Sequence, residues 1–390
     1  MDHLKNLFNK HLRIKSSSSD NNPGQDQEHY QACWPAELES PPTILGYVLD
    51  VNDRGYSRDI GRSFQLGGFT YYVFGDTFCK DQDGYFRGIT SNTVALVSDT
   101  GKPTKCTYQS IDDKGMVAAF LPLTESEKLY REEDAKTRIM LWSFGGLVEV
   151  KEGVGYVWYQ KSIERKGSGQ STTEYVGSGI ARVEVDCETG ELTTTRCGEL
   201  ISPEEPGFGC LSAIKHGHHV YLYGQRSGSC KIVLARVAPH EVENTAAYEH
   251  WDGEGWQLNN CDNAATLWED IPQASVFRSS LFGEQYPFVM VGVTKWCDNK
   301  VQVGIAPAPQ GPWQIKDVGV AEPLKVSGGH RYCIYAHPWA SEGGKDLFLT
   351  WSETWPGGVV AAKLTFTMQS PPPTPDSSAE DKPAEVEKEL

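Results

Sequence analysis

Five short apolar and aromatic runs recur along the chain and predict the central strands of five repeated units. Each run lies between two further candidate strands, and Gly, Asp, Asn and Pro residues typical of turns separate the three. Successive runs start 59 to 84 residues apart. The runs are "YYVFGDTF" from Tyr71, "GYVWYQKS" from Gly155, "VYLYGQRS" from Val220, "FVMVGVTKW" from Phe288 and "LFLTWSET" from Leu347.

One antiparallel sheet per unit, repeated radially, is the way in which a β-propeller removes its sheet edges. We therefore predict an all-β chain folded as a five-bladed β-propeller over residues 40–368, with three or four strands per blade. The segment 43–51, "TILGYVLDV", is expected to close the ring by pairing with the C-terminal strand. Only residues 124–138 read as a helix of more than two turns. A sandwich of two sheets stays open, because counting strands does not distinguish radial from face-to-face packing.

Both ends of the chain differ in composition from the middle. Residues 1–35 combine apolar positions at helical spacing with basic residues and then a polar stretch, which predicts a leader with a short amphipathic helix and a disordered segment. A weak contact of this helix with a membrane surface or a protein is the alternative. Residues 370–390 are acidic, rich in proline and almost free of apolar residues, so a disordered tail is expected.

The composition of the chain indicates which partners and which cellular location to expect. The 390 residues carry a formal net charge of −16, which argues against a nucleic-acid partner because phosphate binding needs concentrated Lys and Arg. No apolar run is long enough for a transmembrane segment, and the start of the chain lacks the pattern of a signal peptide. We expect a cytoplasmic protein, with unconventional secretion as the alternative.

The ten cysteines are scattered singly and form no C-x-x-C motif. Cys187 and Cys197 flank a turn and are the only pair with hairpin spacing, but reduced thiols are the preferred interpretation. The sequence therefore predicts no structural disulfide, no metal site and no cofactor.

The strand "YYVFGDTF" contains a candidate catalytic residue. It is apolar until it ends at Asp76, and a buried charge without a partner is costly, so the carboxylate at this position needs a reason. If Gly67 and Gly68 form a two-residue hairpin turn, Asp59 of the preceding strand faces Asp76. Two carboxylates so placed repel each other and titrate as a pair. Glycoside hydrolysis requires such a pair, one as acid and one as nucleophile or base.

Other interpretations of these acids remain open. Asp76 is also suited to capping a turn, and Asp59 to a surface ion pair with Arg58. Glu353 ends the fifth central strand as Asp76 ends the first, which makes it a third candidate catalytic acid or an ordinary exposed strand end.

Polar and aromatic residues on equivalent strands are candidates for substrate binding. A guanidinium at Arg278 suits a sugar hydroxyl or a carboxylate, with a buried ion pair as the alternative. Aromatic faces suit sugar rings, although tryptophans between blades are more often core, and His337 is more often a satisfied histidine than a ligand. The candidates of this kind are Arg278, Tyr335, His337 and Trp351.

Three segments, "YSRDIGRSF", "YVFGDTF" and "SNTVAL", together resemble the start of a propeller family known as domain of unknown function 4185. Members of this family form glycoside hydrolase family 183, the endo-acting D-arabinanases. The resemblance extends over roughly residues 46–366. It implies catalytic roles for Asp59 and Asp76, and it adds Arg87 and Asn92 to the candidate substrate-binding residues.

The expected function is that of a glycoside hydrolase acting on furanosidic, D-arabinan-like or related glycans. The alternative is a propeller that binds a glycan or a protein at the same position without catalysis.

Overall fold

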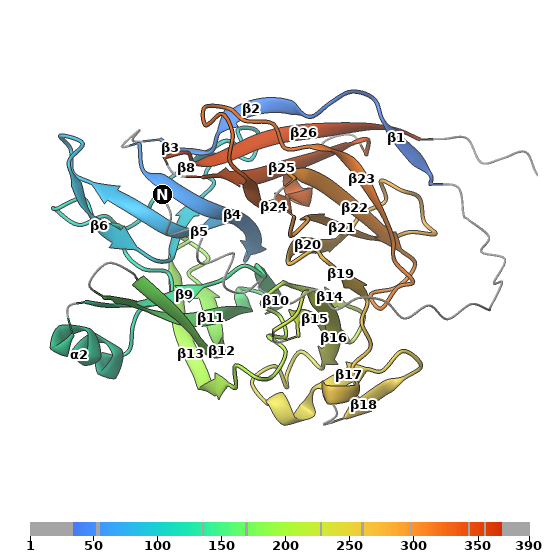
Figure 1. The fold of residues 1–390 in the computed structure, drawn as a ribbon, viewed down its shortest axis with the longest axis horizontal. Helices are drawn as coiled ribbons and strands as arrows, with labels where there is room; N and C mark the ends of the chain where they lie inside the picture. The colour runs from blue at the N-terminus through green and yellow to red at the C-terminus, as the bar shows by residue number, and fades with distance from the viewer. Residues whose placement is uncertain are drawn as a thin grey trace, which may run out of the picture.

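The computed structural model describes residues 34–368, except 52–54, 135, 168–170, 227, 259–260, 297, 342–343 and 355. The predicted leader helix and the predicted acidic tail lie outside the described residues. The described part forms five antiparallel sheets that follow one another around a common centre, as the colour sequence in Figure 1 shows. The five-bladed β-propeller is therefore confirmed, and the sandwich is excluded.

The strands of the blades follow the order of the chain. Blade one contains β4 (Ser57–Leu66), β5 (Phe69–Lys80), β6 (Phe86–Thr90) and β7 (Thr93–Leu96). Blade two contains β9 (Thr137–Trp142), β10 (Leu147–Lys151), β11 (Val154–Lys166), β12 (Ser171–Val185) and β13 (Leu192–Ile201). Blade three contains β14 (Ser212–His216), β15 (His219–Gln225), β16 (Lys231–Val237), β17 (Glu249–Trp251), β18 (Trp256–Leu258) and β19 (Trp268–Glu269).

Blade four contains β20 (Gln273–Arg278), β21 (Phe288–Val293), β22 (Lys300–Ala306) and β23 (Gln314–Val320). Blade five contains β24 (Arg331–Ala336), β25 (Asp346–Glu353), β26 (Val359–Met368), β1 (Ala36–Leu38) and β2 (Thr43–Tyr47). A short parallel pair, β3 (Leu49–Asp50) and β8 (Lys105–Cys106), stands apart from the blades. The five apolar runs of the sequence are β5, β11, β15, β21 and β25, and each is paired on both sides.

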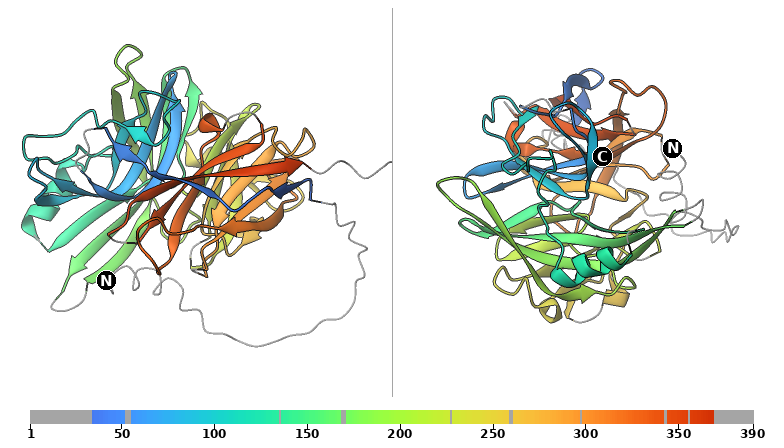
Figure 2. Two further views of the ribbon diagram at one scale, coloured as in Figure 1. Left: turned by 90° about the horizontal axis from the view of Figure 1, so that it is seen from above. Right: turned by 90° about the vertical axis from the view of Figure 1, so that its left-hand side faces the viewer.

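The ring closes where the sequence predicted. Strand β2 pairs with the C-terminal strand β26, and β1 pairs with another part of β26. Figure 2 shows these N-terminal strands, in blue, beside the red C-terminal strand. The start and the end of the described chain therefore share one blade, which prevents an exposed edge at the seam.

Five apolar cores, one at each interface between adjacent blades, hold the ring together. For example, Tyr71 of blade one packs in one cluster with Val157 of blade two, while Phe74 packs on the other side with Phe348 of blade five. Corresponding clusters join blades two and three, three and four, and four and five. The central strand of each blade is buried on both faces. Its sequence is therefore a continuous apolar run rather than an alternation of apolar and polar residues.

A buried arginine occupies the axis of the ring and joins all five blades. Arg62 of β4 donates hydrogen bonds to the carbonyl of Gly145 in blade two, Oγ of Ser212 in blade three and the carbonyl of Ala274 in blade four, at 3.2 to 3.4 Å. Its guanidinium lies 5.0 Å from the ring centre of Tyr335 in blade five. Burial lowers the pKa of Arg62 to about 10.

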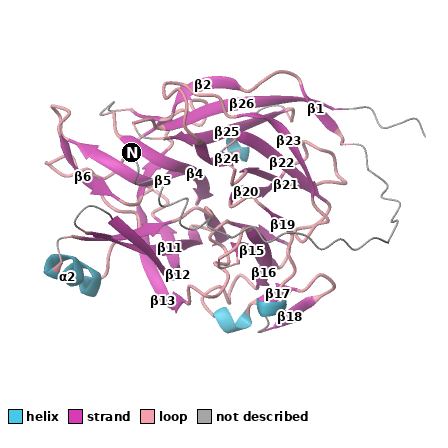
Figure 3. Cartoon of the chain, viewed as in Figure 1, coloured by secondary structure: helices cyan, strands magenta, loops and turns pink. Residues whose placement is uncertain are grey.

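The helix predicted over residues 124–138 is shorter than expected. Helix α2 (Glu125–Glu133) begins with a capping box, in which Thr124 Oγ1 accepts the N–H of Glu127 and the Glu127 carboxylate accepts the N–H of Thr124. The chain then turns and enters β9 at Thr137. Figure 3 shows this helix at the outside of the strands that make up most of the molecule.

Candidate active site

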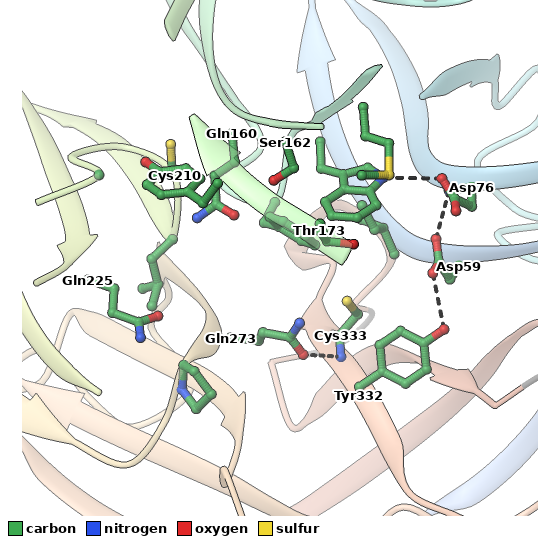
Figure 4. A pocket seen from close by; sticks show the side chains of 18 of the residues that line it. Asp59, Asp76, Gln160, Ser162, Thr173, Cys210, Gln225, Gln273, Tyr332 and Cys333 are labelled. Carbon is green, nitrogen blue, oxygen red and sulfur yellow. Dashed lines mark hydrogen bonds between the residues drawn. The ribbon is translucent and has the colours of Figure 1, made fainter. Parts of the chain in front are cut away.

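A cavity of about 610 Å³ opens near the centre of the propeller and is lined by side chains of all five blades. Asp59 and Asp76 lie on its blade-one wall, and Tyr332 of blade five lies beside them (Figure 4). The volume is within the range of ordinary ligand sites. The two aspartates that the sequence indicates as a candidate catalytic pair therefore line one cavity.

The hairpin that carries the two aspartates has the predicted turn and, with one interruption, the predicted register. Gly67 and Gly68 have φ values of 56° and 84°, which a two-residue hairpin turn of this type requires. Pairing runs from Leu66 opposite Phe69, is interrupted by a bulge around Ile60, and returns at Arg58 opposite Thr77. As a result Asp59 lies beside Asp76, but not as a regular directly opposed pair.

The bulge determines how closely the acids approach. Ile60 has a φ of 67°, a left-handed conformation that is strained for a β-branched residue, and Gly61 follows with 70°. The β5 backbone at Gly75 has no room for a side chain, because a Cβ there would lie 2.4 Å from Asp59 Oδ1 and 2.8 Å from Ile60 Cδ1. Glycine at position 75 therefore allows the Asp59 carboxylate to reach β5.

Asp59 is held by two donors in a partly buried position. Its Oδ1 accepts the backbone N–H of Asp76 at 2.9 Å, and its Oδ2 accepts the Tyr332 hydroxyl at 3.1 Å. Desolvation, followed by the negative charge of Asp76, raises the pKa of Asp59 to about 7, although both hydrogen bonds and Arg138 act in the opposite direction. Asp59 is thus a carboxyl group that exchanges a proton near neutral pH.

A second strained residue positions Tyr332. Cys333 has a φ of 52°, at a bulge in β24, and its N–H donates to Gln273 Oε1 at 2.7 Å. Two of the four non-glycine residues with positive φ in the described chain, Ile60 and Cys333, therefore line this one cavity. Strain of this kind concentrates at functional sites, where the surrounding structure supports it.

The Asp76 carboxylate accepts hydrogen bonds from one cationic and one neutral side chain, whereas the donors to Asp59 are all neutral. Arg138 Nη2 forms an ion pair with Asp76 Oδ1, and Trp142 Nε1–H donates to the same oxygen at 3.2 Å. The other amino group of Arg138 lies 3.9 Å from a carboxylate oxygen of Glu164, a buried acid on the same cavity wall. The negative charge of Asp76 is therefore compensated, and a third carboxylate lies next to the pair.

Sequence reasoning missed Arg138, Trp142, Glu164 and Tyr332. Arg138 was assigned to the end of the helix, whereas it is the second residue of β9. One usable signal was present in β11, where all residues from position 160 to 166 except Ile163 are polar although the first half of the strand is apolar. The side chains of Gln160, Ser162, Glu164 and Lys166 all line the cavity.

Across the cavity from the acids, the lining includes neutral hydrogen-bonding side chains from blades two, three and four. Gln273 points into the space with its amide, while its oxygen accepts the N–H of Cys333 (Figure 4). Charged side chains line this part of the cavity as well, namely Lys166, Glu205, Arg226 and Lys295. The neutral amides and hydroxyls suit a ligand rich in hydroxyl groups. The residues of this kind are Gln160, Ser162, Thr173, Gln225 and Gln273.

Glu353 lines the same cavity, but its carboxylate is directed to a loop. Its Oε1 accepts the backbone N–H groups of Leu324, Lys325 and Val326 at 2.6, 3.2 and 3.4 Å, and its Oε2 accepts the hydroxyl of Tyr47. Glu353 is also almost completely buried, so it is not an exposed strand end. Its carboxylate holds the loop that precedes β24.

The six residues expected to bind substrate are not among the described residues that line the cavity. Arg87 is ion-paired with Asp81, and Arg278 is an exposed residue at the end of β20, so it is not part of a buried ion pair. The other four, Asn92, Tyr335, His337 and Trp351, are buried.

The contacts of these buried residues are structural. Asn92 bonds the backbone of Leu121, and His337 bonds the hydroxyls of Ser63 and Thr350. Trp351 belongs to the apolar core between blades four and five.

The alternative ion pair of Asp59 with Arg58 does not occur. Arg58 is buried, donates to the Tyr108 hydroxyl at 2.6 Å and lies 3.7 Å from the ring centre of Phe74. No cluster of three or more residues suited to a metal ion occurs in the described part of the chain. Nor does any helix found there have the length and apolar character needed to cross a bilayer.

The model of one protein family, Domain of unknown function (DUF4185), matches residues 56–357 of this chain. This chain belongs to the DUF4185 family. The match includes blades one to four, the strands β24 and β25 of blade five, and both aspartates. It confirms the family suggested by the segments around Asp59, Asp76 and Asn92. No curated protein matches the chain.

The chain is also similar to solved structures, one of them with a TM-score above 0.5. A Bacteroides ovatus protein named "a putative hydrolase" has a TM-score of 0.58 and 17% identity, with 82% of this chain and 86% of that chain covered. The GH43_1 enzyme from Xanthomonas citri in complex with xylose has a TM-score of 0.44 and 10% identity, with 84% and 94% covered. A xylan beta-1,4-xylosidase from Bacillus halodurans has a TM-score of 0.41 and 12% identity, with 84% and 54% covered. At these identities the likeness concerns the fold alone.

Proposed function

We propose that this DUF4185 protein is a glycoside hydrolase whose acid pair is Asp59 and Asp76. The observation that carries the proposal is the unequal environment of two adjacent carboxyl groups in one open cavity. The pKa of Asp59 is raised to about 7, whereas Asp76 is bonded to a guanidinium and an indole N–H. An acid with a raised pKa beside a second carboxylate that is held by an ion pair is suited to hydrolysis of a glycosidic bond.

In the proposed mechanism, protonated Asp59 gives its proton to the glycosidic oxygen as the bond to the leaving sugar breaks. Asp76 stays ionised and acts as the nucleophile, or as the base that takes a proton from water. Arg138 and Trp142 fix the orientation of the Asp76 carboxylate. The Tyr332 hydroxyl and the N–H of Asp76 hold Asp59, and they stabilise the carboxylate that forms when Asp59 has lost its proton.

The substrate class in this proposal is a neutral, furanosidic, D-arabinan-like glycan. The amide and hydroxyl side chains in the cavity lining support a hydroxyl-rich ligand, and the resemblance to family 183 favours arabinan. The Bacteroides ovatus protein of similar fold that is named a hydrolase is consistent with a hydrolytic function.

The test is incubation of the protein with a panel of arabinans, xylans and aryl furanosides, with release of reducing ends or of the aryl group as the readout. We expect cleavage of at least one furanosidic substrate by the parent and none by Asp76→Asn. If neither the polymers nor the aryl furanosides are cleaved, or if the parent and Asp76→Asn act equally, the proposal is wrong.

A further inference from the structure

A row of apolar side chains leads out of the cavity along one face of the β5–β6 hairpin. Alternate residues of β5 share a face, so Phe78 lies on the same side as Asp76. Ile89 of β6 is paired opposite Phe78, and both line the cavity. The Phe86 ring follows, with its centre 6.3 Å from that of Phe78. We define the aromatic strip as four residues: Phe78, Ile89, Phe86 and Tyr85, which precedes Phe86 in the chain.

The outer end of the aromatic strip is exposed to solvent. Phe86 is 59% exposed and Tyr85 is 69% exposed. Single exposed apolar residues are common, but the Phe86 ring continues the cavity lining that Phe78 and Ile89 form, and the preceding residue Tyr85 is a second exposed ring. Exposed apolar groups next to a cavity are typical of binding sites.

The fold of the hairpin does not depend on these exposed rings. At the tip, Asp81 Oδ1 accepts the N–H groups of Asp83 and Tyr85 at 3.0 and 2.9 Å, and the other oxygen of Asp81 is paired with Arg87. Backbone hydrogen bonds between Asp81 and Tyr85, and between Gly84 and Asp81, complete the turn. Polar contacts thus form the tip, and the exposed rings need another explanation than stability.

We propose that the aromatic strip binds successive sugar rings of a glycan chain that extends from the cavity past Asp76. This inference rests on the proposed hydrolase function. The C–H face of a sugar ring is slightly positive and apolar, so it packs on the negative face of an aromatic ring and removes apolar area from water. The strip is continuous with the cavity that holds the acids, and the net charge of −16 disfavours a polyanionic chain there.

The wall of blade four ends in a similar way. Trp296 is 63% exposed, and the ammonium group of the cavity-lining residue Lys295 lies 4.4 Å from the centre of its ring. Blade four is not a neighbour of blade one in the ring, so Trp296 is a second exposed aromatic ring beside a cavity-lining residue, on a separate wall.

The kinetic test compares a linear arabinan with an aryl arabinofuranoside that is too short to reach the strip. For Phe86→Ala and for the double variant with Tyr85→Ala, we expect the ratio of kcat/KM on polymer to kcat/KM on the aryl substrate to fall about tenfold, mainly through KM on the polymer. Leu129→Ala is the matched control, because Leu129 on α2 is also 59% exposed but does not line the cavity. This control should not change the ratio.

A binding test makes the inference independent of turnover. In affinity gel electrophoresis, the Asp76→Asn protein should be retarded by arabinan, and Phe86→Ala on that background should lose most of the retardation. An unchanged ratio and unchanged retardation overturn the aromatic strip but leave the hydrolase proposal intact. If the parent cleaves nothing, the hydrolase proposal fails, and the gel alone decides on the strip. An equal loss on both substrates also overturns the strip, because it indicates damage to the hairpin.

Discussion

Asp59 Oδ1 accepts the backbone N–H of Asp76 at 2.9 Å, so one acid of the pair holds the strand that presents the other. The bond crosses the β4–β5 hairpin at the bulge where Ile60 has a positive φ. This arrangement brings two negative groups together without making them equivalent. Asp59 has only neutral donors, whereas Asp76 is paired with Arg138.

The first prediction concerns removal of either charge. Asp59→Asn should lower kcat by about 10² to 10⁴-fold, the range for loss of a general acid, and Asp76→Asn should abolish turnover. Both variants should fold, and Asp59→Asn should be at least as stable as the parent, because asparagine still accepts the N–H of Asp76 without burying a charge. Circular dichroism and thermal unfolding at pH 8 check the fold. If Asp59→Asn unfolds many degrees below the parent, the burial of the Asp59 charge beside Asp76 does not cost the parent stability.

The second prediction concerns the dependence of stability on pH. The pKa of Asp59 is about 7 in the folded protein and about 3.9 in an unfolded chain. Between these values the folded state holds a proton that the unfolded state has lost. This contribution to stability is fully present below about pH 4 and is lost as the pH rises through about 7. Relative to Asp59→Asn, the parent should therefore lose free energy of unfolding from pH 5 to pH 8, measured by urea titration at each pH.

The same group controls activity in the proposed mechanism. Because the protonated form of Asp59 is the acid, kcat/KM of the parent should decline above about pH 7. A difference in stability between parent and Asp59→Asn that is constant over pH 5 to 8, together with a flat basic limb, would mean that Asp59 does not titrate in this range.

The blades were predictable because the sequence signals for their strands and turns lie within short segments of the chain. Each apolar run is bounded by turn residues, and Gly67 with Gly68 fixed the pairing from Leu66–Phe69 onward. The bulge was not predictable, because isoleucine has no preference for the left-handed conformation that Ile60 adopts; the closed ring imposes it.

The site was predictable only in part, because its partners come from distant segments. Asp59 and Asp76 share one hairpin, but Arg138, Glu164 and Tyr332 reach them from blades two and five. Glu353 shows the converse. Glu353 lies at the end of an apolar central strand, a position that resembles that of Asp76. Its carboxylate instead accepts the backbone N–H groups of residues 324–326, a long-range contact that no local sequence pattern predicts.

The third prediction separates the two hydrogen bonds of Asp59. In the parent, the Tyr332 hydroxyl donates to Asp59 Oδ2, and this hydrogen bond favours the ionised carboxylate. Tyr332→Phe removes this donor. The pKa of Asp59 should rise further, and the basic limb of kcat/KM should move to higher pH by about one unit. A loss of activity that is uniform over the whole pH range would indicate a packing role for Tyr332 instead.

The fourth prediction concerns the close approach of β5 to Asp59. The backbone of Gly75 is outside the left-handed region, so alanine is acceptable for its φ, but the added Cβ would meet Asp59 Oδ1 at 2.4 Å and the Ile60 side chain at 2.8 Å. Gly75→Ala should destabilise the protein by about 1 to 3 kcal/mol, as overpacking does, and lower activity by displacing the Asp59 carboxylate.

Gly255→Ala is the matched control for this substitution. It is also free of a positive φ, and its nearest neighbour would be Gln257 Nε2 at 3.8 Å, an ordinary contact. Stability and activity should therefore stay within about 0.5 kcal/mol and twofold of the parent. The pH profile gives the sharper readout for Gly75→Ala, because a displaced Asp59 loses the N–H of Asp76 and its basic limb should shift as well. A variant at Gly75 with the parent's stability and the parent's pH profile would show that β5 can move away from Asp59 at no cost, and that the close contact between the strands does not position the acid.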